Sequence, residues 1–302
     1  MLVNEAETFV GKTVVLVNDI DLSVYGRGYN GGRGWIPIGR GQLISFFGVF
    51  DGNKKKITGL FIDDITLEYA GLFASVRGTR STIRNLGLQD VNINGGEYVG
   101  GLAAFVGGGV GGRIENCYVT GTIIGTRTVG GLIAWLHYPN SLLTDSYSTA
   151  NVTGTGSVGG LVGTSTVANI VGCYSTGEVR STSTASNRTA GGLVGHGGGS
   201  SITRSAALNS NISTQSTGRG RITGNADAAT LAGNVAFNGM TINTAITTGT
   251  ATNHNGADIT AATIRSDGTI GGLFTSANGW TTQNGRLPGL FGETVELPEH
   301  LR

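Results

Sequence analysis

The stretch Val158-Gly159-Gly160-Leu161-Val162-Gly163 opens a unit that occurs five times between Tyr69 and Asn225. An apolar anchor and a short strand-like segment follow each opening, and successive units are 27 to 32 residues long. A period in this range, with no helical pattern inside it, predicts a stacked array in which each unit buries its core against its neighbours. The other openings are Ala70-Gly71-Leu72-Phe73, Val99-Gly100-Gly101-Leu102, Val129-Gly130-Gly131-Leu132 and Ala190-Gly191-Gly192-Leu193-Val194-Gly195.

The composition agrees with a folded chain of short strands and many turns. Gly accounts for 54 of the 302 residues, Pro for only 4, and 38% of the residues are hydrophobic. Without a Gly-x-y period this is not collagen, and it is too apolar for a disordered Gly/Ser tract. The net charge is +1 and no basic stripe is present, so the chain lacks the electrostatic footprint of a nucleic-acid binder. We therefore expect no nucleic-acid partner.

The amino terminus does not resemble a signal peptide, because Met1 to Glu5 turn acidic where a basic region and an apolar run would stand. No stretch approaches the ~18 apolar residues of a membrane helix, so no membrane insertion of this segment is expected. Two settings stay open, a cytosolic protein and a mature or excised segment of a larger polypeptide. A repeat array favours the second.

Alternation within each unit predicts which side chains point into the array, because residues two apart share one face of a strand. Two columns of small or apolar residues are expected to face inward, and the columns beside them to face solvent. The inward columns are Leu86, Cys117, Ser146, Cys173, Ser205 and Leu88, Val119, Ser148, Ser175, Ala207. The outward columns are Gly87, Tyr118, Tyr147, Tyr174, Ala206 and Gln89, Thr120, Thr149, Thr176, Leu208.

The outward columns contain the candidate ligand-binding residues of this sequence. Three aromatic rings on consecutive coils, with hydroxyls beside them, suit the face of a sugar or a protein surface. The alternative is that stacked tyrosines only stabilise the sheet, in which case the loop around Tyr25 to Arg33 becomes the next candidate site. The six candidates are Tyr118, Thr120, Tyr147, Thr149, Tyr174 and Thr176.

The glycine runs and the two cysteines have structural interpretations. Gly107 to Gly112 and Gly195 to Gly199 loosely resemble phosphate loops, but neither a Walker lysine nor a following amphipathic helix accompanies them. The glycines are instead expected where the chain turns a corner or meets the backbone of the next coil. Cys117 and Cys173 fall in one column two coils apart, about 9.6 Å, which exceeds the ~7 Å limit for a disulfide. Both are predicted to be buried free thiols.

No catalytic residue, metal site or cofactor is predicted. Asp19, Asp21 and Asp51 could bind calcium, but caps on turn amides are the favoured interpretation. Asp63 and Asp64 would need acidic companions on neighbouring coils to act as the acid and base of a polysaccharide-cleaving enzyme. The histidines, at 137, 196, 254 and 300, occupy unrelated positions in the repeat, so stacking assembles neither a metal site nor a triad.

The Gly-Gly-Leu-Val-Gly tracts and the strands after them, such as Ile114-Glu115-Asn116-Cys117-Tyr118-Val119-Thr120-Gly121, resemble the GLUG repeat of bacterial surface proteins. Val17 to Leu60 is similar to the lead-in of such proteins, and Gly279-Trp280 with Gly285 to Leu290 is similar to their closing element. The resemblance implies a right-handed parallel β-helix in secreted or surface-anchored bacterial proteins, often adhesins and some related to IgA peptidases. It implies no set of catalytic residues.

Together these patterns predict a single elongated all-β domain, a parallel β-helix of about nine to eleven coils at one coil per repeat period. Residues 1–68 would form the N-terminal cap and first coils, 69–225 five GLUG-like coils, and 226–302 degenerate coils and a C-terminal cap. We expect a non-catalytic binding or spacer module, secreted or on the cell surface as the resemblance implies, that adheres to a glycan or to a host or matrix protein. The alternative is a carbohydrate-active β-helix enzyme, a polysaccharide lyase or glycoside hydrolase.

Overall fold

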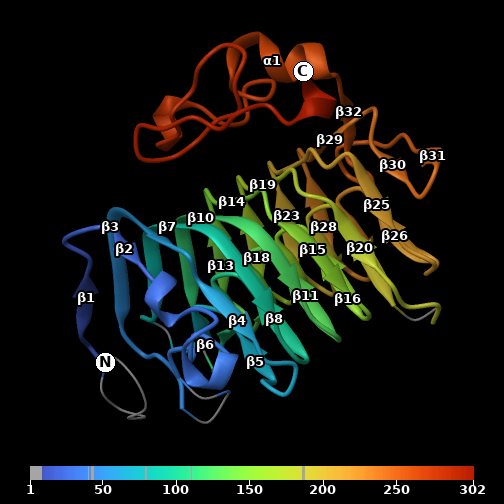
Figure 1. Ribbon diagram of the computed structural model, residues 1–302. Coiled ribbons are helices and arrows are strands. Elements are labelled where there is room, and N and C mark those ends of the chain that lie inside the picture. The colour runs from blue at the N-terminus through green and yellow to red at the C-terminus, as the bar shows by residue number, and fades with distance from the viewer. Residues whose placement is uncertain (1–8, 40, 42–43, 79, 110, 186–187) are drawn as a thin grey trace.

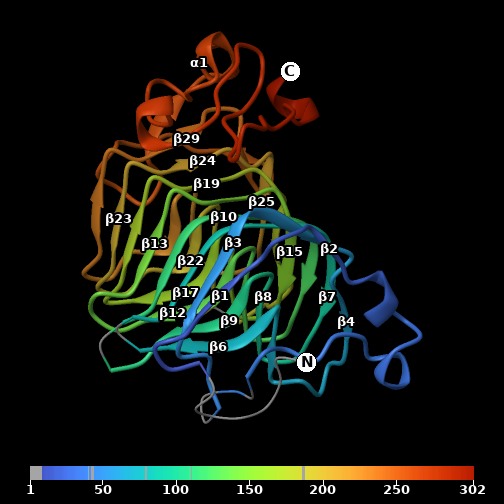
Figure 2. The ribbon, with the colours of Figure 1, turned by 90° about the vertical axis from the view of Figure 1, so that its left-hand side faces the viewer.

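The chain winds into a stack of parallel β-strands, with its C-terminal segment folded back along one side of the stack (Figures 1 and 2). The computed structural model describes residues 9–39, 41, 44–78, 80–109, 111–185 and 188–302. Every pair of named strands is parallel except the short hairpin of β30 (Thr241–Ile242) and β31 (Ala245–Ile246). The β-solenoid predicted from the repeat is therefore confirmed.

Two of its three sheets have six strands each and meet at the Gly-Gly-Leu corner. The first sheet comprises β5 (Tyr69–Ala70), β8 (Tyr98–Gly100), β11 (Thr128–Gly130), β16 (Ser157–Gly159), β21 (Thr189–Gly191) and β26 (Gly218–Gly220). The second comprises β6 (Phe73–Arg77), β9 (Ala103–Gly107), β12 (Ile133–His137), β17 (Val162–Thr166), β22 (Val194–His196) and β27 (Thr223–Asn225).

The third sheet has 20 strands and closes each turn. Its early members are β1 (Thr13–Val15), β2 (Ile20–Asp21), β3 (Val49–Thr58), β4 (Phe61–Asp63), β7 (Thr82–Asn94) and β10 (Arg113–Ile124). Its middle members are β13 (Leu142–Thr144), β14 (Tyr147–Ser148), β15 (Asn151–Gly154), β18 (Asn169–Val171), β19 (Tyr174–Ser175), β20 (Val179–Ser181), β23 (Ser201–Thr203), β24 (Ala206–Ala207) and β25 (Asn211–Ser213). Its last members are β28 (Thr230–Ala232), β29 (Val235–Phe237), β30, β31 and β32 (Ala257–Ile259).

The solenoid has about six turns, one for each strand of the two smaller sheets. The prediction of nine to eleven coils is wrong, because it assigned a coil to every repeat length of the whole chain. Before β5 the described chain adds strands only to the large sheet, together with the short 3-10 turns η1 (Ser23–Tyr25) and η2 (Asn30–Gly32). After β32 the chain leaves the stack altogether (Figure 1).

The inward columns predicted from alternation are confirmed. All ten residues are buried, and the register pairs Cys117 with Leu86 and Val119 with Ser148. Serines in these columns satisfy backbone groups: the Cys117 N–H donates to Ser146 Oγ at 3.0 Å, and the Cys173 N–H donates to Ser205 Oγ at 3.1 Å. A small hydroxyl therefore replaces an apolar side chain without leaving a buried polar group unpaired.

Both cysteines are free and buried, as predicted. Burial raises the pKa of the Cys117 thiol to about 12 and raises that of Cys173 as well. Because only a thiolate reacts readily, the folded protein should show less than about 0.1 reactive thiol per chain with Ellman's reagent at pH 8, and two after denaturation in guanidinium. Rapid labelling of the native protein would show that these coils open.

Glycine is required at the corner because neighbouring backbone lies where a Cβ would stand. A Cβ on Gly131 would lie 2.1 Å from the Gly160 carbonyl oxygen, and one on Gly160 would lie 2.2 Å from that of Gly192. Leu132 and Leu161, the next residues along the chain, are fully buried. The structural interpretation of the Gly-Gly-Leu tracts is therefore confirmed.

The last coil departs from the repeat, because Arg221 takes the place of the second glycine. Its guanidinium is fully buried and donates to the carbonyl oxygens of Asn255 and Gly256 and to the Asp258 carboxylate. The buried charge is thus paired and hydrogen-bonded, as burial of an ion requires. Arg221 ties the last Gly-Gly-Leu corner to the strand β32, where the stack ends.

The C-terminal segment runs from residue 260 to 302 and lies over the large sheet beside β10, β14 and β19 (Figure 1). It begins with α1 (Ala261–Asp267), whose N-cap Thr260 accepts a hydrogen bond from the Thr263 N–H and whose C-cap Gly268 has φ 69°. The 3-10 turns η3 (Ser276–Asn278) and η4 (Glu299–Leu301) follow. Within the described residues, no helix has the length and the hydropathy needed to cross a bilayer.

Candidate functional site

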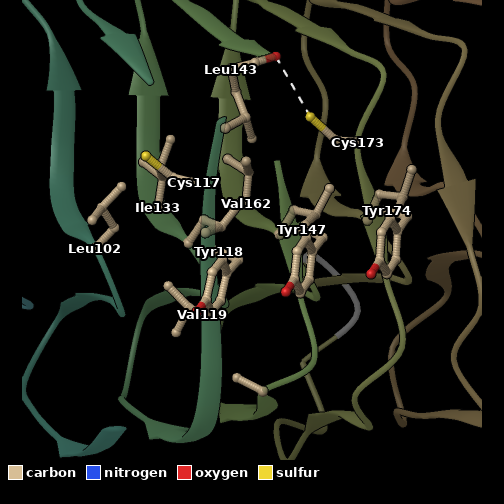
Figure 3. Close-up of a cluster of buried hydrophobic side chains, with 14 of the residues drawn as sticks. Leu102, Cys117, Tyr118, Val119, Ile133, Leu143, Tyr147, Val162, Cys173 and Tyr174 are labelled. Atoms are coloured by element: carbon tan, nitrogen blue, oxygen red, sulfur yellow. Dashed lines mark hydrogen bonds between the residues drawn. The ribbon is translucent and has the colours of Figure 1, made fainter. Parts of the chain in front are cut away.

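The predicted tyrosine column is a continuous stack of rings (Figure 3). Tyr118 and Tyr147 have ring centroids 5.0 Å apart with an interplanar angle of 6°, and Tyr147 and Tyr174 have centroids 4.9 Å apart with an angle of 3°. The register that pairs Tyr118 with Tyr147 and Tyr147 with Tyr174 agrees with the sequence alignment. The side chains point out of the solenoid, as alternation requires.

The expectation that these rings face solvent is wrong. The exposed fractions of Tyr118, Tyr147 and Tyr174 are 4%, 5% and 0%. The C-terminal segment covers them: the Trp280 ring lies 5.7 Å from that of Tyr174, and the Phe291 ring lies 6.0 Å from that of Tyr118. The segment itself follows no repeat, so alignment of the coils gave no reason to place it there.

A direct hydrogen bond also holds this cover in place, since the Tyr174 hydroxyl donates to the Pro288 carbonyl oxygen at 2.6 Å. The Tyr118 hydroxyl instead accepts from the amide of Gln89, on the neighbouring strand β7, at 3.0 Å. Burial raises the pKa of Tyr118 to about 12 and raises the pKa values of Tyr147 and Tyr174 well above the usual value. The stack is therefore uncharged at physiological pH, and the C-terminal segment covers the side that faces away from the solenoid.

The threonines beside the stack offer little free surface. Thr176 is buried, with 7% exposed, and Thr120 and Thr149 are half-buried. Thr120 Oγ1 accepts a hydrogen bond from the Asp90 N–H at 3.0 Å. The Tyr-x-Thr face is thus brought together as predicted, but in this conformation it is an interior contact.

A different surface is hollowed along the Gly-Gly-Leu corner, where the first and second sheets meet. Two cavities of about 290 Å³ and 430 Å³ lie on adjoining coils there. Residues of the first cavity pair in register with residues of the second, since Ser157 pairs with Thr189 and His196 with Asn225. We call the two cavities together the corner groove. Its lining residues are Tyr98, Arg127, Thr128, Trp135, Ser157, Thr164, Arg188, His196, Thr189, Thr217, Gly218, Arg219, Gly224, Asn225, Ala226, Asp227 and His254.

One end of the corner groove is a second aromatic stack. Tyr69 and Tyr98 are parallel, with centroids 4.9 Å apart, and Trp135 continues the stack with its centroid 5.9 Å from that of Tyr98 at 15°. The Arg127 guanidinium lies 5.6 Å from the Tyr98 centroid, a cation–π distance, and pairs with Glu97 at 3.0 Å. Tyr98 and Trp135 are only half-buried, so this stack, unlike the first, keeps an open surface.

Glycine backbone forms part of the groove floor. A Cβ on Gly224 would lie 2.6 Å from the Ala190 backbone nitrogen, so nothing larger than hydrogen is accommodated there. Along the wall, the register pairs Trp135 with Thr164 and then His196 with Asn225. The side chains that follow, Thr164, His196 and Asn225, are all smaller than the Trp135 indole and leave the hollow beyond it.

A third cavity, of about 590 Å³, lies between the C-terminal segment and the outer side of the large sheet. Asn85 and Asn116 line it in the left-handed conformation, with φ 52° and 49°, and the Asn116 amide donates to Asn85 Oδ1 at 3.4 Å. Leu290 and Phe291 line it from the C-terminal segment. This hydrogen bond joins two successive turns of the solenoid at the base of the cavity that the C-terminal segment covers.

Of the acidic residues considered as calcium ligands, Asp21 and Asp51 cap local turn amides, as the favoured interpretation predicts, whereas Asp19 accepts from the backbone of strand β3. Asp21 accepts from the Ser23 N–H, Asp51 from the Asn53 N–H, and Asp19 from the Lys56 N–H. The hydrogen bonds from Ser23 lower the pKa of the Asp21 carboxyl. Burial acts to raise the pKa of the Asp51 carboxyl, but the hydrogen bonds from Asn85, Asn53 and Arg84 lower it overall. Across the described part of the chain, no three His, Cys, Asp or Glu side chains gather as a metal site would require.

The paired acids of β4 and the turn after it are also engaged locally. Asp63 accepts a hydrogen bond from the Asn94 amide at 2.9 Å, and Asp64 accepts from the Thr66 N–H at 3.0 Å. Arg33 Nη1 lies 3.8 Å from Asp64 Oδ2. Neither carboxylate is among the residues that line the corner groove.

Comparison with known proteins agrees with this geometry. Residues 95–124 match the family model described as "The GLUG motif". The chain has a TM-score of 0.71 and 21% identity to a solved structure named as "a putative immunoglobulin A1 protease from Bacteroides ovatus", and the match covers 95% of this chain and 88% of that chain. At this identity the likeness establishes the fold. The chain is thus a parallel β-solenoid that carries a GLUG motif.

Two sequence relatives have far longer chains. Over 132 residues the chain is 34% identical to "Halomucin" of Haloquadratum walsbyi, a match that covers 44% of this chain and 1% of that protein. Over 94 residues it is 42% identical to a "Putative Gly-rich membrane protein" of Evansella cellulosilytica, a match that covers 30% of this chain and 10% of that protein. The matched region is therefore a small part of each relative.

Sequence reasoning missed the corner groove because it followed only the strands after each apolar anchor. The same alternation, applied to the Gly-Gly-Leu opening, would have found it. Tyr98, Thr128 and Ser157 directly precede three of the openings, while Trp135 and Thr164 stand three residues after the buried leucine. These positions face outward from two sheets that meet at one corner.

Proposed function

We propose that this solenoid is a non-catalytic binding module that holds an extended glycan in the corner groove. The observation that supports this most strongly is the axial hollow with the half-buried Tyr98–Trp135 stack at one end. Aromatic faces pack against the apolar face of a sugar ring, and Ser157, Thr164 and Asn225 supply hydrogen-bonding groups farther along the groove. Because the hollow follows successive coils, it suits a linear chain better than a compact ligand.

The proposal includes an extracellular setting within a larger polypeptide. The GLUG motif, which resembles repeats of bacterial surface proteins, supports this setting. One relative is named as a membrane protein, and the structural neighbour is named as an immunoglobulin A1 protease. In such a protein the module would contribute adhesion rather than cleavage.

We favour binding over polysaccharide cleavage because of the position of the carboxylates. Glycosidases place two carboxyl groups about 5 to 9.5 Å apart. Among the described lining residues the one acid is Asp227, on the sixth coil, and Glu97, which adjoins Tyr98 in the sequence, is on the second, a separation of about 19 Å at ~4.8 Å per coil. Glu97 is also paired with Arg127. The described residues of the groove thus supply no acid–base pair at catalytic spacing.

Replacing Trp135 by alanine should weaken glycan binding about 2- to 12-fold, the equivalent of one aromatic contact of about 0.5–1.5 kcal/mol. An array of neutral and anionic oligosaccharides would identify binders, and titration calorimetry would compare the variants. Trp135→Phe keeps a ring and should retain most of the affinity. The exposed Tyr25, outside the groove, provides the control Tyr25→Ala. If no array glycan binds the intact chain, or Trp135→Ala binds as well as the parent, the proposed function is wrong.

A further inference from the structure

The charges along the corner groove have a regular placement. In the parallel register Thr128 pairs with Ser157 and Ser157 with Thr189, so the residues that precede them, Arg127, Gly156 and Arg188, form one column. Arg127 and Arg188 therefore lie two coils apart, about 9.6 Å along the solenoid axis, with a glycine between them. Arg219 pairs with Ala190 and adds a third guanidinium on the next coil.

Two of these arginines have no acidic partner. Among the described residues no carboxylate lies within 4.0 Å of the guanidinium of Arg188 or Arg219. The Arg127 guanidinium, in contrast, forms an ion pair with Glu97. Within the described part of the chain, the Arg219 guanidinium donates one long hydrogen bond, of 3.4 Å, to the Ser216 carbonyl oxygen. Asp227, at the far end of the groove, accepts from the Asn225 amide at 2.9 Å. The guanidinium groups of Arg188 and Arg219, on the fifth and sixth coils, thus have no ion-pair partner among the described residues, although Asp227 lines the same cavity as Arg219.

We infer that the glycan held in the corner groove is anionic, with carboxylate-bearing sugars that recur along its chain. This inference rests on the proposed function and specifies its ligand. A guanidinium presents paired N–H donors that match both oxygens of a carboxylate. Arg188 and Arg219 bind the carboxylates, while Trp135 and Tyr98 pack against the face of a neighbouring sugar. The overall charge of +1 makes this attraction local to the groove rather than a property of the whole surface.

Pairs of ligands that differ only in charge separate the contribution of the carboxylates from that of the sugar chain. Oligogalacturonate and hyaluronan oligosaccharides are each compared as the free acid and as the methyl ester, which has the same chain without the charge. We expect at least one free acid to bind about tenfold more tightly than its ester. Raising NaCl from 0.05 to 1 M shortens the screening length from ~14 to ~3 Å, and this should remove most of that difference.

Substitutions that remove one positive charge at a time identify the arginines that attract the ligand. Arg188→Gln and Arg219→Gln should each weaken binding of the free acid by about 3- to 10-fold and weaken binding of the ester less, so that the preference for the acid falls. Arg180, exposed on β20 and outside the groove, provides the charge-matched control Arg180→Gln. Melting temperatures within about 2 °C of the parent would show that the fold is intact.

The outcomes of these comparisons are distinct. Esters that bind as tightly as acids, or array hits that are all neutral, would overturn the anionic ligand and leave glycan binding in place. Absence of binding to every array glycan would overturn both proposals. A single-stranded oligodeoxynucleotide should not compete with the free acid; competition would show unspecific attraction of polyanions and would also contradict the inference.

Discussion

Replacement of Tyr174 by alanine should lower the free energy of unfolding by about 3–5 kcal/mol, the range for a large buried aromatic residue. The ring is fully buried between Tyr147, Phe274 and Trp280, and its hydroxyl donates to the Pro288 carbonyl oxygen. The substitution thus removes contacts from both the solenoid and the C-terminal segment. Denaturant unfolding followed by circular dichroism measures the change.

Tyr174→Phe serves as the matched variant, because it keeps the ring and removes only the hydroxyl. Its expected cost is about 1–3 kcal/mol, since the buried Pro288 carbonyl loses its donor. A change below about 1 kcal/mol for Tyr174→Ala would show that the C-terminal segment does not rest on the tyrosine stack. The stack would then be an open surface and would return as a candidate binding site.

Replacement of Gly160 by alanine should destabilise the solenoid by about 3 kcal/mol or more, at the upper end of overpacking effects. The added Cβ would lie 2.2 Å from the Gly192 carbonyl oxygen and 2.6 Å from Ser175 Oγ. Backbone of the adjoining coil cannot move away without breaking the parallel register. Thermal unfolding of the variant and the parent gives the comparison.

Gly28→Ala is the control, because nothing lies within 4 Å of the position its Cβ would take. It should change stability by less than about 0.5 kcal/mol, as surface substitutions usually do. Equal stability of Gly160→Ala and the parent would contradict the role assigned to the Gly-Gly-Leu corner.

The sequence predicted the repeating part of the fold because each residue there is constrained by its counterparts on neighbouring coils. Cys117 and Cys173 could be placed in an inward column because alternation and period agreed in every unit. The number of turns could not be predicted in the same way, since residues 260–302 have no counterpart in another coil. Their position depends on which apolar surface remains uncovered after the stack has formed.

The candidate site could be predicted only in part for the same reason. Alternation gave the stacking and the outward direction of Tyr147 and Tyr174, but exposure depends on long-range contacts such as that between Tyr174 and Pro288, 114 residues apart. The corner groove is likewise a product of two sheets that meet at an angle. Alternation applied to the Gly-Gly-Leu openings indicates that Tyr98 and Trp135 face outward, but their stacking at 5.9 Å, between different sheets and coils, depends on the angle at which the sheets meet.

The three tryptophans of the chain report separately on the three surfaces that sequence and structure offer for a ligand. Trp135 lines the corner groove. Trp280 lies against the tyrosine stack, 6.2 Å from the Tyr147 ring, and Trp35 packs against Tyr25 in the N-terminal loop region, with ring centroids 5.8 Å apart. A ligand that enters one surface will perturb the indole N–H signal of the tryptophan there.

The most direct test is therefore a titration of the ¹⁵N-tryptophan-labelled chain with the tightest-binding oligosaccharide of the array, followed by NMR of the three indole signals. Binding in the corner groove predicts a saturable shift of the Trp135 signal, while the signals of Trp35 and Trp280 stay in place. A saturable shift of Trp280 or Trp35 without a shift of Trp135 would contradict the assignment of the corner groove as the ligand site.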